Sequence, residues 1–155
     1  MGKNTHAKIG KWGGGGGNAN DVSKTPKQLL SVTITADANG IRSIYFRYTA
    51  SDGSTCTDGW GDNTAGTTYK IDLCSCGESI TEIYGTTGNY STSNSTIMVK
   101  SLKFVTNKGN QYGPYGCTSG DTFSAQVLNG GTIEGFHGRS GGCFLDAIGV
   151  YVDPK

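Results

Sequence analysis

The residues with the clearest chemical potential lie near the C-terminus, in a glycine-rich stretch that ends in an acid, Gly141-Gly142-Cys143-Phe144-Leu145-Asp146. Glycine lets backbone N–H groups approach a ligand closely, and an ionised carboxylate accepts charge-assisted hydrogen bonds. A sugar offers neighbouring hydroxyls that can donate to the carboxylate and accept from N–H groups. The stretch therefore predicts a site for a small polar ligand. The competing interpretation is a surface aspartate that ends a turn.

Other chemistry finds less support in the sequence. Glycoside hydrolysis generally uses two carboxylates that face each other, and the stretch around Asp146 offers it no acidic partner. No D-x-D-x-D-G calcium loop is present, and Cys74-Ser75-Cys76 is too tightly spaced for the usual zinc-binding pair. We therefore expect no catalysis, no metal and no cofactor.

Composition limits the class of protein and its partners. The chain has 155 residues, the size of one domain, and its net charge is +1 with 16% charged residues, which argues against nucleic acid as a partner. It has no apolar run of about 18 residues for membrane insertion, and Met1 to His6 lack the apolar core of a secretory signal. The odd count of five cysteines suits free thiols in a reducing compartment. We expect a cytoplasmic or nucleocytoplasmic protein.

The pattern along the chain predicts strands and no helix. Runs rich in β-branched and aromatic residues alternate with clusters of Gly, Asn, Asp and Ser, which is typical of an all-β domain. No window shows the 3.6-residue period of an amphipathic helix with caps. The segments expected as strands are 28–35, 41–48, 68–73, 79–85, 98–106, 122–128, 132–137 and 145–152.

Internal repetition organises these segments into units. Residues 42–46, 100–104 and 146–150 share one pattern, in which a polar and a small residue precede alternating apolar residues. Aromatic-glycine pairs recur as well. We infer three similar β units around a pseudo-threefold axis. Only the third unit has an acid at the first position of the pattern, Asp146, whereas the others have Arg42 and Lys100.

Two segments carry a resemblance to a known family. They are Lys8-Ile9-Gly10-Lys11-Trp12-Gly13-Gly14-Gly15-Gly16-Gly17 and the block from Gly135 to Tyr151, in which a G-x-x-x-D signature falls on Gly142 to Asp146. The chain resembles a jacalin-related plant lectin of the uncleaved, mannose-binding kind. The resemblance implies an all-β fold, a β-prism of three four-stranded Greek-key sheets with pseudo-threefold symmetry. It also implies a lectin domain over residues 8–155, preceded by a flexible extension over residues 1–7.

The resemblance also implies where sugar binds. The glycine run would lie beside the signature loop, and Asp146 would accept hydrogen bonds from the sugar 4- and 6-hydroxyls. Backbone N–H groups of Phe144 and Leu145 would donate to the ring oxygen and the 6-oxygen, and that of Gly17 would donate from the opposite side. A third wall would come from the loop around residues 88–91. The expected contacts are Gly16, Gly17, Asn89, Tyr90, Gly142, Cys143, Phe144, Leu145 and Asp146.

Departures from the family pattern refine the expected site. Gly15 stands where relatives often have asparagine, which predicts a more flexible loop and lower affinity. A second G-x-x-x-D is missing from the first unit, because the segment that begins at Gly40 ends in Ile44. One site per chain is therefore expected. We expect Arg139 to support the glycine loop without touching sugar.

The expected function is that of a lectin for mannose- and glucose-containing glycans or glycoproteins, with one shallow site per chain and no catalysis. Because one shallow site binds weakly, we expect a homo-oligomer, a dimer or a tetramer, to supply several sites. The alternative is a jacalin-type protein-interaction or defence module with weak or lost sugar binding. A glycoside hydrolase is the third hypothesis.

Overall fold

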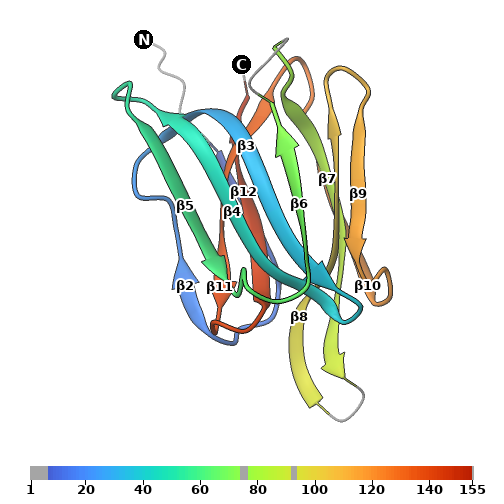
Figure 1. Cartoon of the computed structure of the whole chain (residues 1–155). Helices are drawn as coiled ribbons and strands as arrows, with labels where there is room; N and C mark the ends of the chain where they lie inside the picture. Colours follow the sequence, from blue (N-terminus) through green and yellow to red (C-terminus); the bar gives the residue numbers. More distant parts are fainter. Residues whose placement is uncertain (1–6, 74–76, 92–93, 155) are drawn as a thin grey trace.

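The computed structural model describes residues 7–73, 77–91 and 94–154. Within them the chain forms strands and no helix, which confirms the expected all-β class (Figure 1). No helix in the described residues is long and apolar enough to cross a membrane. The tightly spaced pair Cys74 and Cys76 lies outside the described residues.

The described residues form twelve strands, which include every segment expected from the residue pattern and add four that this pattern did not predict, β1, β2, β5 and β9. The strands are β1 (Ala7–Gly13), β2 (Asn18–Asn20), β3 (Pro26–Asp37), β4 (Gly40–Ala50), β5 (Thr55–Gly61), β6 (Thr67–Asp72), β7 (Ile80–Ser91), β8 (Asn94–Thr106), β9 (Gln111–Gly116), β10 (Asp121–Gln126), β11 (Thr132–Ser140) and β12 (Leu145–Asp153).

The strands form three units, as the repeats predicted, and each unit is a Greek key, as the resemblance implied. The first unit has the order β5-β4-β3-β6 and the second has the order β10-β7-β8-β9. The third has the order β1-β12-β11-β2, so both ends of the chain complete it. In each unit the fourth strand returns beside the first, which is the Greek-key connection. A single pairing between Ile133 and Ile80 joins the second and third units into one larger sheet.

A β-bulge at the same place in each unit shows that the repeats are structurally equivalent. In the first unit the register of β3 against β4 skips one residue between the pairs Thr35–Ser43 and Ala36–Ile41. The register skips in the same way between β7 and β8 and between β11 and β12. The residues left without a partner are Arg42, Lys100 and Asp146. Because a bulge turns a side chain away from the regular face of the sheet, these three side chains are directed differently from their neighbours.

A glycine on the neighbouring strand packs against each bulge. Each of these glycines has a positive φ, and a Cβ there would come within 2.3–2.4 Å of the carbonyl oxygen of the bulge residue. The glycine–carbonyl pairs are Gly13–Asp146, Gly61–Arg42 and Gly116–Lys100. This close approach explains why an aromatic-glycine pair recurs in the sequence, since only glycine fits there.

The core lies between the three units and is formed by one face of each sheet. Phe136 from the third unit contacts Phe46 from the first and Phe104 from the second, with ring centroids 5.1 and 5.9 Å apart. Edge-to-face packing of this kind stabilises aromatic pairs beyond the burial of their area. The core therefore joins the separate sheet of the first unit to the larger sheet formed by the second and third units.

The close approach at the bulge predicts an effect of substitution at Gly61. Alanine at Gly61 (φ +102°) meets both an unfavourable φ and the Arg42 carbonyl, whereas alanine at Gly53 (φ +90°) meets only the unfavourable φ because nothing lies within 4 Å. Gly53→Ala should lower the free energy of unfolding by about 1–2 kcal/mol. Gly61→Ala should lower it by about another 1–3 kcal/mol, as overpacking does. Urea unfolding measures both, and equal losses would contradict the account.

Candidate functional site

The connection between β11 and β12 meets the connection between β1 and β2 at the lower end of the molecule in Figure 1. The Gly14 N–H donates to the Asp146 carbonyl at 2.9 Å, so the glycine run lies beside the signature loop, as expected. A hollow of about 300 Å³ opens between the two loops. Its lining residues are Gly16, Gly17, Thr96, Gly141, Cys143, Phe144 and Asp146.

The structure brings together only part of the expected contact set. Five of the nine expected residues line the hollow, and they are Gly16, Gly17, Cys143, Phe144 and Asp146. The Leu145 side chain is fully buried in the core instead, and Gly142 forms the turn before it with φ +98°. Leu145 can therefore contribute only through its backbone.

Asp146 is not on an exposed loop, which corrects the expectation from the sequence. It belongs to β12 at the bulge described above, and only 2% of its surface is exposed. The glycine run covers it, since a Cβ at Gly16 would lie 3.4 Å from its Oδ1. Burial raises the pKa of this carboxyl, while a backbone hydrogen bond from Gly141 and the charge of Arg139 lower it, and burial has the larger effect. Asp146 is therefore a buried hydrogen-bond acceptor, and the few atoms beside its carboxylate belong mostly to the backbone.

The glycine run owes its path to two contacts. Gly17 has φ +66°, and a Cβ there would lie 2.3 Å from the carbonyl carbon of Ser140, so only glycine fits. Arg139 donates from Nε to the Gly16 carbonyl at 3.1 Å and from Nη2 to the Gly17 carbonyl at 2.8 Å. Arg139 thus supports the loop, as predicted. A Cβ at Gly15 would meet no atom within 4 Å, so this position could accept a side chain.

The signature loop is held from within and from the first unit. Ser140 Oγ donates to the Phe144 carbonyl at 3.0 Å and accepts from the Gly142 N–H at 3.1 Å, which closes the turn. Arg42 donates from Nη1 to the Cys143 carbonyl at 3.2 Å. Arg42 is itself oriented by Asp37, which accepts from its Nε at 2.6 Å. The first unit therefore fixes the loop of the third.

A third wall was expected from the loop around residues 88–91, but no described residue of β7 lines the hollow, and Thr96 of β8 lines it instead. Tyr90 stacks on Phe144 with ring centroids 5.1 Å apart, and the Arg42 guanidinium lies 5.8 Å from the Tyr90 ring centroid. Lys100 donates to the Asn89 carbonyl at 3.1 Å, while the Asn89 side chain is exposed. Tyr90 thus supports the lining residue Phe144, whereas neither Tyr90 nor Asn89 lines the hollow itself.

Sequence reasoning missed two lining residues and the role of two cations. Gly141 adjoins the signature and could have been included from its position. Thr96 lies on β8, the strand that pairs with β7, and it lines the hollow. No motif or spacing in the sequence identifies it as a site residue. Arg42 and Lys100 were identified as replacements for Asp146, but the contact of Arg42 with the Cys143 carbonyl depends on how the first and third units pack, and that of Lys100 with the Asn89 carbonyl lies within the second unit.

The arrangement is suited to hydrogen bonding and not to acid–base chemistry. Asp146 is the single carboxylate among the described residues that line the hollow. No group of three or more His, Cys, Asp or Glu side chains in the described segments could hold a metal ion. Cys143 is exposed and free, and Cys56 and Cys117 are also free thiols.

Comparison with known proteins agrees with this geometry. The model of the Jacalin-like lectin domain matches residues 9–151. Horcolin of Hordeum vulgare subsp. vulgare is 42% identical over 149 residues, which cover 95% of this chain and 97% of horcolin.

Two solved structures are also similar. The mannose-binding jacalin-related lectin AcmJRL from Ananas comosus superposes with a TM-score of 0.86 at 35% identity, covering 97% of this chain and 99% of that one. Artocarpin in complex with mannopentose gives a TM-score of 0.83 at 32% identity, with the same coverage of 97% and 99%. The chain therefore belongs to the jacalin-related lectin family and is a carbohydrate-binding β-prism lectin, not an enzyme.

Proposed function

We propose that this lectin binds mannose- and glucose-type glycans in the hollow at Asp146. The observation that carries the proposal is the buried Asp146 carboxylate, which lines a hollow of about 300 Å³ and has Gly16 and Gly141 beside its oxygens, so that no side chain at these two positions blocks a ligand. Adjacent sugar hydroxyls can donate to its two oxygens, and such charge-assisted hydrogen bonds are stronger than neutral ones. The mannose complex of the related artocarpin supports the same class of sugar.

The path of the N-terminal segment supports mannose over galactose. Galactose-binding members of the family are cut near the glycine segment, which places a free amino group at the site. Here β1 leads into Gly14–Gly17 without a break in the chain. The Arg139 contacts with the Gly16 and Gly17 carbonyls hold this continuous loop in place.

Assembly and location form part of the same proposal. A hollow of this size buries few groups of a sugar, so one site binds weakly, and a homo-oligomer, a dimer or a tetramer, would supply avidity for branched glycans. A cytoplasmic or nucleocytoplasmic location is consistent with the free thiols of Cys56, Cys117 and Cys143.

Asp146→Asn tests the proposed site directly. The amide has the same shape, but it replaces a charged double acceptor with one neutral acceptor and one donor. Since hydrogen bonds to charged groups contribute about 1.5–3 kcal/mol each, affinity for methyl α-mannoside should fall about tenfold or more. Isothermal titration measures this loss, and methyl α-galactoside should compete poorly in the wild-type protein.

The control is Asp121→Asn, which alters an exposed aspartate at the start of β10. It should leave affinity unchanged. Unaltered mannoside binding by Asp146→Asn would assign the site elsewhere. A wild-type protein that binds none of these sugars would favour the alternative of an interaction or defence module.

The buried carboxylate also predicts a pH-dependent effect on stability. Burial raises the pKa of Asp146 in the folded state, so the folded state holds the proton more tightly than the unfolded state and is destabilised where Asp146 is ionised. Asp146→Asn should therefore raise the melting temperature at neutral pH. This gain should shrink as the pH falls through the raised pKa toward the ordinary value of 3.8. A pH-independent difference in melting temperature would exclude this cause.

Arg42 provides a test of the support given by the first unit. Arg42→Met keeps the apolar stem but removes the hydrogen bond to the Cys143 carbonyl and the cation beside Tyr90. Removing one such hydrogen bond costs about 0.5–1.5 kcal/mol of free energy. Mannoside affinity should therefore fall roughly two- to tenfold. Arg42→Lys should recover part of it. Arg47→Met, at an exposed position of β4, should have no effect, and equal effects of the two methionine variants would contradict the role of Arg42.

A further inference from the structure

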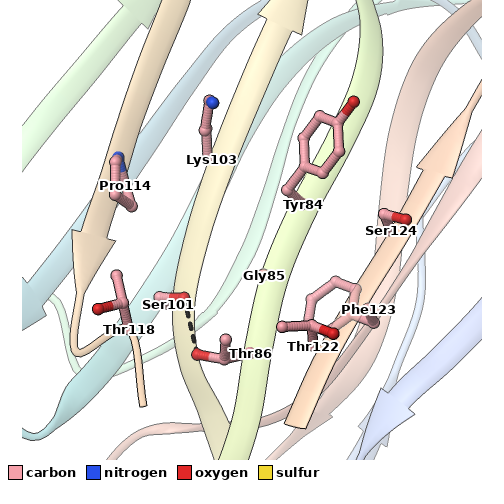
Figure 2. Close-up of a pocket in the computed structure, with 10 residues that line it drawn as sticks. All are labelled: Tyr84, Gly85, Thr86, Ser101, Lys103, Pro114, Thr118, Thr122, Phe123 and Ser124. Carbon is pink, nitrogen blue, oxygen red and sulfur yellow. Dashed lines mark hydrogen bonds between the residues drawn. The ribbon is translucent and has the colours of Figure 1, made fainter. Parts of the chain in front are cut away.

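A second hollow lies on the outer face of the second unit and shares no lining residue with the hollow at Asp146 (Figure 2). Its volume is about 520 Å³, against about 300 Å³ at Asp146. Ligand pockets in proteins commonly have volumes of roughly 300–1,000 Å³. The second hollow is therefore large enough for a small ligand.

Two buried hydroxyls lie at its base. Thr86 Oγ1 and Ser101 Oγ are 2.8 Å apart, and Thr86 also donates to the Cys117 carbonyl at 3.2 Å (Figure 2). Because the Thr86 proton is used on Cys117, Ser101 must donate to Thr86. Ser101 Oγ keeps lone pairs that can accept a hydrogen bond from a ligand.

The rim adds further hydroxyls and apolar surfaces. Thr122 and Ser124 are exposed on β10, and Thr118 lies across the hollow beside Pro114 (Figure 2). Hydroxyls can both donate and accept, and the Tyr84 and Pro114 rings offer flat apolar contact. This mixture matches a sugar ring, which presents hydroxyls at its edge and C–H groups on its faces.

The apolar wall is held in place before any ligand binds. Phe123 stacks on Trp12 with ring centroids 4.8 Å apart and an interplanar angle of 10°. Its ring also lies close to Gly85, where a Cβ would come within 2.4 Å of Phe123 Cζ. A fixed ring reduces the ordering cost of binding.

The charges in and around the hollow favour a neutral ligand. None of the described residues that line it is acidic, and Lys103 is its one cation. The Lys103 ammonium lies 5.5 Å from the centroid of the Tyr84 ring, and the Tyr84 hydroxyl donates to the Glu82 carboxylate. That negative charge near the rim opposes an anion, since like charges repel.

We propose that this hollow is a second carbohydrate site, which takes a neutral saccharide unit. None of its described lining residues is a carboxylate equivalent to Asp146, so it differs in kind from the one signature-type site that the repeats predict. It also does not depend on sugar binding at Asp146, because the two hollows are built from different residues.

The test uses the Asp146→Asn chain, in which binding at the first site is expected to be weakened. Mannotriose and maltotriose are titrated while the backbone amide signals of Gly85, Thr122 and Ser124 are followed by NMR. Saturable shifts at these amides are expected with either sugar. Thr122→Tyr should fill the hollow and weaken this binding at least tenfold. Thr57→Tyr, the same change at an exposed threonine of edge strand β5, should leave it intact.

Three results would overturn the proposal. They are no saturable shift with either oligosaccharide, shifts that Thr122→Tyr leaves unchanged, and saturation by glucuronate alone, which would make the hollow an anion site at Lys103. In the wild-type chain the amides of Gly17 and Gly141 report the first site separately. A failure at Asp146 and a failure at the second hollow are therefore distinguishable.

Discussion

The β-bulge in each long strand pair is the constraint on which the rest of the molecule depends. At each bulge the carbonyl of the unpaired residue accepts a hydrogen bond from the residue that follows the packed glycine. The donor–acceptor pairs are Gly14–Asp146, Asp62–Arg42 and Cys117–Lys100, at 2.9, 3.0 and 2.8 Å. The bulge thus ties the end of one strand to the turn of its neighbour. It also directs one side chain per unit away from the regular faces of the sheet.

The proposed signature-type site can occur only once in this symmetric arrangement because the three bulge residues differ. Asp146 can accept hydrogen bonds from a ligand, whereas Arg42 and Lys100 can only donate. Arg42 donates to the carbonyl of Cys143, which lines the Asp146 hollow, whereas Lys100 donates to the carbonyl of Asn89, which does not line it. Arg42 therefore supports the signature loop of the third unit, and Arg139 supports the glycine run in the same manner.

The buried carboxylate illustrates a compromise between folding and binding. Removing Asp146 from water disfavours its charged form, and only part of this cost is offset by Gly141 and Arg139. The same burial strengthens each hydrogen bond that a ligand makes to it, because the local dielectric is low. A buried acid of this kind lowers the stability of the fold, so its presence is better explained by ligand binding than by a role in folding. Functional sites commonly reduce folding stability in this way.

The sequence by itself determined the all-β class, the three units and the neighbourhood of Asp146. Alternating side chains and glycine turns are local signals, and the signature block resembles a family whose geometry is known. Only the tertiary structure decided that Asp146 is buried at a bulge, that Leu145 belongs to the core, and that Thr96 lines the hollow. These features depend on contacts between distant segments, such as the one that joins Arg42 and Cys143 across 101 residues. A local pattern carries no record of such contacts, because packing between units decides which side chains meet.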